Sequence, residues 1–162
     1  MPDTFAERDL RDETAALLRD LLRVDTTNPP GNETAAATLL KDYLEASGVH
    51  CELIARDPDC ANLVARIPGT GDGPSLALLG HTDVVPAEPA GWQHPPFAGH
   101  LDDDGYIWGR GAIDMKNDTA SRAVALAVLA RSGFRPRGDL LLIAEADEEN
   151  GADVVPTSAP TT

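Results

Sequence analysis

Cysteine is scarce in this sequence: Cys51 and Cys60 are its only two, and no C-x-x-C motif is present. Two thiols cannot build the framework of several disulfides that stabilises small secreted domains. Cys51 lies within a pattern typical of a β-strand, so we expect it to pack in the core. We therefore interpret both thiols as reduced, in a cytoplasmic protein.

Basic residues are also few, because 13 lysines and arginines stand against 27 aspartates and glutamates, which gives a formal net charge of −14. Nucleic-acid binding requires a basic surface, and an anionic membrane also attracts basic residues. The composition therefore excludes both of these partners. Clustered carboxylates suit a cation site, although an acidic residue most often does no more than solvate a surface.

Long apolar runs are missing as well. No stretch approaches the ~18 consecutive apolar residues that a transmembrane helix requires. The first 13 residues, MPDTFAERDLRDE, are acidic and lack the apolar run of a secretory signal. The 162 residues suffice for one domain with a hydrophobic core. We expect a single domain that is not inserted in a membrane.

The order of the predicted elements indicates an α/β fold. Apolar residues at helical spacing predict a first helix whose inner face includes Leu10, Leu17 and Leu21, and which Asn28-Pro29-Pro30-Gly31 ends. The remaining predictions are a helix over 33–47, strands over 49–53, 62–67 and 75–80, a hairpin over 97–109, a helix over 116–132 and a strand over 139–144. The strands over 75–80 and 139–144 show no polar alternation, which predicts that both of their faces are covered.

Polar side chains follow both of these apolar strands. His81 and Asp83 come after the first strand, Glu148 and Glu149 follow the second, and Asp114 lies between a glycine-rich turn and a helix. Ligands of open α/β sheets bind outside the carboxyl ends of the strands, so all five side chains can meet at one edge. Imidazole and carboxylate groups are good zinc ligands. Taken one by one, the same residues are also explained as a structural histidine, a helix cap and a surface glutamate pair.

Four stretches together resemble a known family: NPPGNE, GHTDVVP, GRGAIDMK and ADEENG, in that order. They are similar to motifs of the di-zinc metallopeptidases that include aminoacylase, acetylornithine deacetylase, succinyl-diaminopimelate desuccinylase and glutamate carboxypeptidase. The resemblance covers residues 8–152. It implies a three-layer αβα catalytic domain of the zinc-peptidase type, with a mixed and mostly parallel sheet.

The resemblance also implies a role for each polar residue. His81 corresponds to the histidine ligand of one metal, and Asp83 to the aspartate that supports this histidine. Asp114 corresponds to the carboxylate that bridges two metals, which a cis peptide often follows. Glu148 corresponds to the general base and Glu149 to a ligand of the second metal. The implied cofactor is Zn²⁺, two ions in a full site, with Co²⁺ or Mn²⁺ as alternatives.

The implied activity is that of a metallopeptidase or deacylase, in which metal-bound water cleaves the amide bond of an N-acyl amino acid or a small peptide. Members of the family carry further ligands beyond the glutamate pair, yet no histidine follows His100. We therefore expect residues 1–152 to be the N-terminal part of the catalytic domain and 153–162 to be a disordered tail. We expect the lid domain, through which homodimers form, to be absent. The alternative is a truncated and inactive fragment that serves at most as a metal-binding or interaction module.

Overall fold

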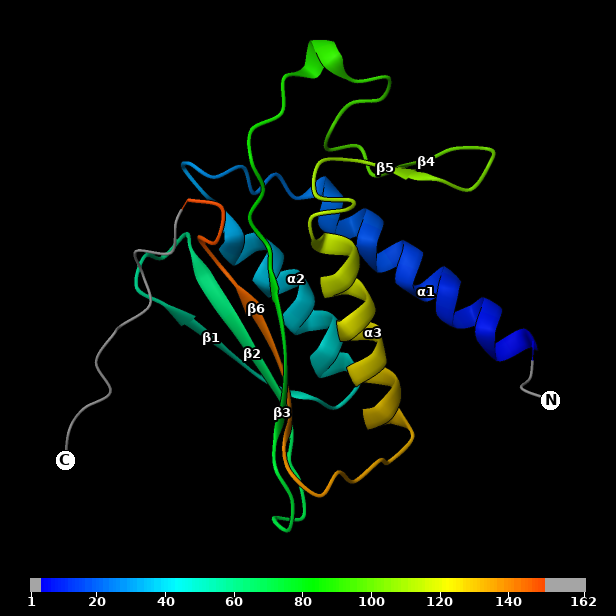
Figure 1. Ribbon diagram of the computed structural model, residues 1–162, viewed down its shortest axis with the longest axis vertical. Coiled ribbons are helices and arrows are strands. Elements are labelled where there is room, and N and C mark those ends of the chain that lie inside the picture. Colours follow the sequence, from blue (N-terminus) through cyan, green and yellow to red (C-terminus); the bar gives the residue numbers. More distant parts are fainter. Residues whose placement is uncertain (1–3, 151–162) are drawn as a thin grey trace.

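The computed structural model describes residues 4–150 (Figure 1), so the tail predicted over 153–162 lies outside the described residues. A four-stranded sheet has the order β1-β2-β6-β3. Its strands span the ranges β1 His50–Ala55, β2 Ala61–Ile67, β3 Leu76–His81 and β6 Leu140–Glu145. The sheet is mixed, as predicted. The prediction that it is mostly parallel is wrong for the described strands, because β2 runs antiparallel to both β1 and β6 and only β3 and β6 are parallel.

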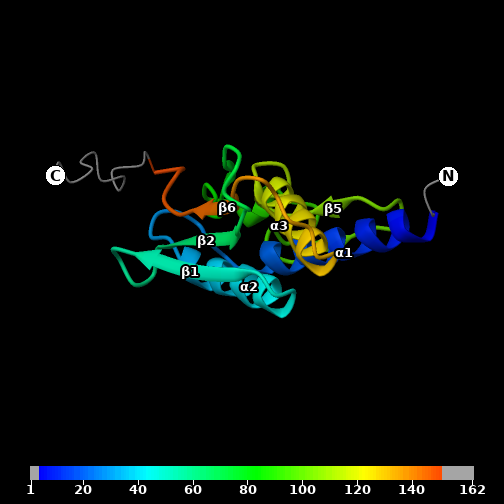
Figure 2. The same ribbon diagram turned by 90° about the horizontal axis from the view of Figure 1, so that it is seen from below.

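Three α-helices pack together with this sheet: α1 Thr4–Arg23, α2 Glu33–Ala46 and α3 Lys116–Arg131. Helix α2 packs on β1 and β2, and α3 packs on β3 and β6. Helix α1 lies beside α3 in both views (Figures 1 and 2). Residues between β3 and α3 form a short 3-10 helix, η1 Pro89–Gly91, and a small hairpin of β4 His100–Leu101 and β5 Ile107–Trp108. The hairpin predicted over 97–109 is confirmed. None of the described helices has the length and apolar character needed to cross a membrane.

The hydrophobic core lies between the three helices and one face of the sheet. Its fully buried leucines come from all of these layers: Leu21, Leu22, Leu40, Leu44, Leu63, Leu126 and Leu142. Along β6 buried and half-buried residues alternate, so that Leu140, Leu142 and Ala144 point toward the helices. Cys51 belongs to the same core, as predicted. The core therefore fixes β6 next to β3, and both strands end at the same edge.

The opposite face of the sheet is open within the described residues. Ala77 and Leu79 on this face of β3 are both exposed, Leu79 by 50%. The prediction that both faces of this strand are covered is therefore wrong for the described part of the chain. The physical reason is that α1, α2 and α3 all join one core on the other face. An uninterrupted apolar run predicted burial but could not tell which layers bury it.

Helix α1 ends at Arg23, five residues before the Asn28-Pro29-Pro30-Gly31 sequence that was predicted to end it. The carbonyl oxygens of Leu21 and Val24 accept hydrogen bonds from the Lys116 ammonium. These carbonyls therefore have donors without a further turn of helix. Leu10, predicted on the inner face, is exposed. The chain that follows α1 then becomes extended.

This extended segment runs alongside the residues that follow β3. Thr27 and Val84 form a parallel bridge, and the backbone N–H groups of Asn28 and Val84 donate to the carbonyl oxygens of Val84 and Thr26, respectively. The Thr26 hydroxyl donates to the Thr82 carbonyl at 2.6 Å. The segment 26–28 therefore lies directly against the residues that carry His81 and Asp83.

Candidate metal centre

His81 is the last residue of β3 and is buried. Its Nδ1 donates to the Asp83 carbonyl oxygen at 3.0 Å, which leaves Nε2 to face carboxylates. Nε2 lies 3.3 Å from Asp114 Oδ1 and 3.8 Å from Glu148 Oε2. The hydrogen bond with Asp83 raises the pKa of His81 to about 9, against the opposing effect of burial. The carboxylates therefore favour positive charge at Nε2, and either a proton or a metal cation can supply it.

Asp83 is fully buried beneath this histidine. Its Oδ2 accepts hydrogen bonds from Asn28 Nδ2 at 3.0 Å and from the Glu149 backbone N–H at 2.9 Å. Its Oδ1 lies 3.3 Å from His81 Nδ1 without an aligned hydrogen bond. Burial alone would raise the pKa of Asp83, but the nearby His81 imidazole and the hydrogen bond from Asn28 lower it below its ordinary value. Asp83 therefore stays ionised and is placed to orient the imidazole.

Asp114 lies in the turn between β5 and α3, and its side chain is 77% exposed. The peptide bond between Asp114 and Met115 is cis, as the resemblance implies. Gly111 begins this turn with a φ of 85°, and its carbonyl accepts the Lys116 backbone N–H at 2.9 Å. The turn thus brings an exposed carboxylate over the end of β3.

Gly111 is required in this turn for two reasons, which leads to a prediction. A Cβ there would lie 2.8 Å from Val84 Cγ1 and 3.2 Å from Lys116 Cδ, besides the strain of the positive φ. We expect Gly111→Ala to lower the free energy of unfolding, measured by urea denaturation, by about 2–5 kcal/mol. About 1–2 kcal/mol comes from the left-handed backbone and about 1–3 kcal/mol from overpacking.

The control for this variant is Gly105→Ala, because Gly105 has a φ of 88° and nothing within 4 Å of a built Cβ. In this control the free energy of unfolding should fall only by the backbone cost of about 1–2 kcal/mol. Equal losses in the two variants would show that close packing against Val84 is not the reason for glycine at position 111.

The loop after β6 carries Asp147, Glu148 and Glu149. Asp147 adopts a φ of 64°, which is unusual for a residue other than glycine, and this turns the two glutamates toward His81. Glu148 is 53% exposed, whereas Glu149 is half-buried. Burial raises the pKa of Glu149, opposed by His81 and reinforced by the charges of Asp114, Asp83 and Glu148. A cation at this place would relieve that repulsion.

Ligand atoms of His81, Asp114 and Glu149 all lie within 4.8 Å of one another. One imidazole nitrogen and two carboxylate oxygens are ligands that zinc and similar divalent cations accept. The residues present therefore fit a metal cation, and the fit rests on donors from three separate segments of the chain. The structure thus brings together the three predicted ligands, with Asp83 and Glu148 beside them.

Two buried charges near the centre escaped the sequence analysis. Lys116 is fully buried and donates to the carbonyl oxygens at the end of α1 at 2.9 and 3.0 Å, and burial lowers its pKa to about 8. Glu33 is also fully buried, and its Oε1 accepts the Asp147 backbone N–H at 3.3 Å. Both residues stand in motifs that the resemblance quoted, NPPGNE and GRGAIDMK, which was the only available signal.

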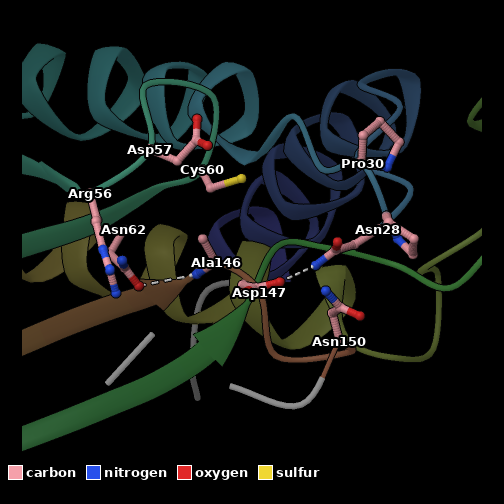
Figure 3. A pocket seen from close by; sticks show the side chains of 10 residues that line it. Asn28, Pro30, Arg56, Asp57, Cys60, Asn62, Ala146, Asp147 and Asn150 are labelled. Atoms are coloured by element: carbon pink, nitrogen blue, oxygen red, sulfur yellow. Dashed lines mark hydrogen bonds between the residues drawn. The ribbon is translucent and has the colours of Figure 1, made fainter. Parts of the chain in front are cut away.

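A cavity of about 420 Å³ lies beside the loop that carries the glutamates (Figure 3). Side chains from the segment after α1, the loop between β1 and β2, the start of β2 and the loop after β6 line it. Asn28 and Asp147 lie on its wall, joined by a hydrogen bond, and Arg56 and Asn62 lie across from them (Figure 3). The cavity therefore adjoins the loop that carries Glu148 and Glu149.

Known proteins resemble this chain in sequence. The family model for peptidase family M20/M25/M40 matches residues 77–159. Succinyl-diaminopimelate desuccinylase from Paracoccus denitrificans is 40% identical over 138 residues, which cover 85% of this chain and 35% of that protein. The same enzyme from a Methylobacterium species is 43% identical over 143 residues, which again cover 85% of this chain and 35% of that protein. The chain thus spans about 35% of the length of these curated relatives.

Solved structures show the same fold. An M20 family metallo-carboxypeptidase from Sulfolobus solfataricus superposes with a TM-score of 0.74 at 26% identity, over 86% of this chain and 32% of that one. Human carnosine dipeptidase 1 superposes with a TM-score of 0.74 at 19% identity, over 88% of this chain and 33% of that one. The arrangement of strands and helices is therefore one found in these structures.

Proposed function

The chain belongs to peptidase family M20/M25/M40, and on that premise we propose that it contributes to the active centre of a metal-dependent amide hydrolase. The observation that carries the proposal is the convergence of ligand atoms from His81, Asp114 and Glu149 within 4.8 Å. We assign the described residues to the N-terminal part of the catalytic domain, which the shares of the relatives' lengths support.

His81, Asp114 and Glu149 are the residues that would hold Zn²⁺. The role of a carboxylate shared by two ions, which the resemblance implies, would fall to Asp114. A divalent cation bound there would supply Lewis acidity, which polarises an amide carbonyl and makes water easier to deprotonate. Asp83 keeps His81 oriented through its carbonyl oxygen and its carboxylate. The two residues therefore act as a ligand and its support.

Glu148 is the residue we assign as general base. Its carboxylate is half-exposed and lies 3.8 Å from His81 Nε2, beside the ligands. Within residues 4–150 no hydrogen bond occupies it. In amide hydrolysis it would take a proton from the attacking water as the C–O bond forms. It would return that proton to the amine nitrogen as the C–N bond breaks. This balances the reaction with water as the only co-reactant.

The relatives suggest the substrate class. Succinyl-diaminopimelate desuccinylases are named for removing a succinyl group from an amino acid. We propose an N-acyl amino acid or a small peptide as the substrate, and N-succinyl amino acids are the first compounds to assay.

A metal-binding module without turnover is the second candidate. Asp114 and Glu148 are largely open to solvent in the described part of the chain, whereas amide hydrolysis benefits from an active site that excludes water. Titration calorimetry with ZnCl₂, combined with an assay for free amine from N-succinyl amino acids, separates the two candidates. Zinc binding with turnover supports the hydrolase and zinc binding without turnover supports the module, while absence of binding contradicts both.

A further inference from the structure

Asn28 occupies a buried position between two loops of the candidate metal centre. Its backbone N–H donates to the Val84 carbonyl at 2.9 Å, which fixes it beside the residues that follow β3. Its side chain is 5% exposed, so its amide group has to find partners within the protein. The partners it finds belong to both sides of the metal centre.

The Asn28 side-chain nitrogen donates to Asp83 Oδ2 at 3.0 Å and to Asp147 Oδ1 at 2.8 Å. Ionised carboxylates only accept hydrogen bonds, so the NH₂ end of the amide must be the end that faces both of them. Both N–H groups are used in this way. The hydrogen bond from Asn28 to Asp147 joins two residues of the cavity wall and is drawn in Figure 3.

These two bonds join residues that are far apart in the sequence. Asp83 supports His81, while Asp147 directly precedes the two glutamates. The Glu149 backbone N–H also donates to Asp83 Oδ2, the same oxygen that Asn28 contacts. Asn28 and the Glu149 backbone thus share one buried carboxylate oxygen, and the loop after β6 is tied to the end of β3 at two points.

Asp147 is additionally held through its backbone. Its N–H donates to Glu33 Oε1, and its φ of 64° sets the direction in which the following residues leave β6. The Asn28 side chain holds the Asp147 carboxylate through the hydrogen bond to Oδ1. Without it, Asp147 Oδ1 has no other hydrogen-bond donor among the contacts described for that atom.

We propose that Asn28 is a positioning residue of the metal centre: its amide holds the carboxylates of Asp83 and Asp147 together, and so sets the distance from Glu149 to His81. The inference rests on the proposed function for the identity of the site, since it assigns Asn28 an effect on zinc affinity. Asn28 itself contacts none of the three ligand side chains and acts through Asp83 and Asp147.

The test compares Asn28→Ala with Asn32→Ala in the complete chain by titration calorimetry with ZnCl₂. Asn32 is a matched control because it is an exposed asparagine directly before α2. Among the described residues its side chain donates to the Asp25 carbonyl at 3.2 Å and makes no capping bond to α2. We expect Asn28→Ala to weaken zinc binding about 10–100-fold, the usual cost of removing an outer partner of metal ligands. Asn32→Ala should stay within about twofold of the wild type, as a neutral surface substitution does.

A conservative variant separates positioning from general damage to the fold. Asp147→Asn keeps a side-chain oxygen that can accept from Asn28 and a residue type that tolerates positive φ, so its zinc affinity should remain close to that of the wild type. Asp147→Ala removes the acceptor and should behave like Asn28→Ala. Equal zinc affinity of Asn28→Ala and Asn32→Ala, or equal weakening in both Asp147 variants, would overturn the inference.

A second measurement needs no metal. Hydrogen exchange of the Glu149 amide, followed by NMR in zinc-free protein, reports on its bond to Asp83. This exchange should be faster in Asn28→Ala than in Asn32→Ala. If the wild type binds no zinc, the proposed function fails, and the exchange rates still decide the inference: equal rates in the two variants would contradict it.

Discussion

Replacing His81 by alanine is expected to weaken zinc binding by more than about 100-fold, beyond the usual range for outer partners of metal ligands. The variant removes the only nitrogen among the three convergent ligands and leaves two acidic side chains with no imidazole between them. It also removes the group whose Nδ1 contacts Asp83. Titration calorimetry with ZnCl₂ measures the loss directly.

The matched control is His50→Ala. His50 is an exposed histidine at the start of β1, and its Nε2 lies 3.2 Å from Glu52 Oε1. This variant should bind zinc as the wild type does. Zinc affinity that falls equally in both variants would mean that histidines bind the ion non-specifically, and affinity unchanged in His81→Ala would remove His81 from the ligand set.

The second large effect concerns the core that brings the strand ends together. Leu142 is fully buried at the centre of β6, where it pairs with Ala65 of β2 and Leu78 of β3. Leu142→Ala leaves a cavity between the sheet and the helices, so we expect the free energy of unfolding to fall by about 2–5 kcal/mol. Urea denaturation followed by circular dichroism measures the change.

Leu79→Ala serves as the control for Leu142→Ala. Leu79 lies on β3, one strand away, and its side chain is 50% exposed on the open face of the sheet. We expect the free energy of unfolding of this variant to fall by less than about 1 kcal/mol. A loss as large as that of Leu142→Ala would indicate that the open face is covered in solution.

The positions of the predicted metal ligands could be anticipated because of a general property of sheets. His81 is the last residue of β3 and Glu149 follows β6, and these two strands are parallel neighbours in register, with His81 opposite Glu145. The carboxyl ends of parallel strands meet at one edge, so the spacing of apolar runs was enough to predict that these side chains converge. Asp114 was anticipated through the glycine-rich turn before α3.

The direction of the remaining strands could not be anticipated in the same way. The pattern of 62–67 predicted a strand correctly, but strand periodicity reports which side chains are buried and not which way the chain runs. The antiparallel pairing of β2 with both β1 and β6 depends on the loops between them and on packing against α2.

By itself, the sequence determined the α/β class, the order of the elements and the residue types of a cation site, because these depend on local periodicity and on ligand chemistry. Only the tertiary structure decided how that site is held. Asn28 meets Asp83 and Asp147 across 55 and 119 residues, and Lys116 meets the end of α1 across more than 90. Such contacts leave no local pattern, since a buried polar residue is stable only when the folded chain brings its partners to it.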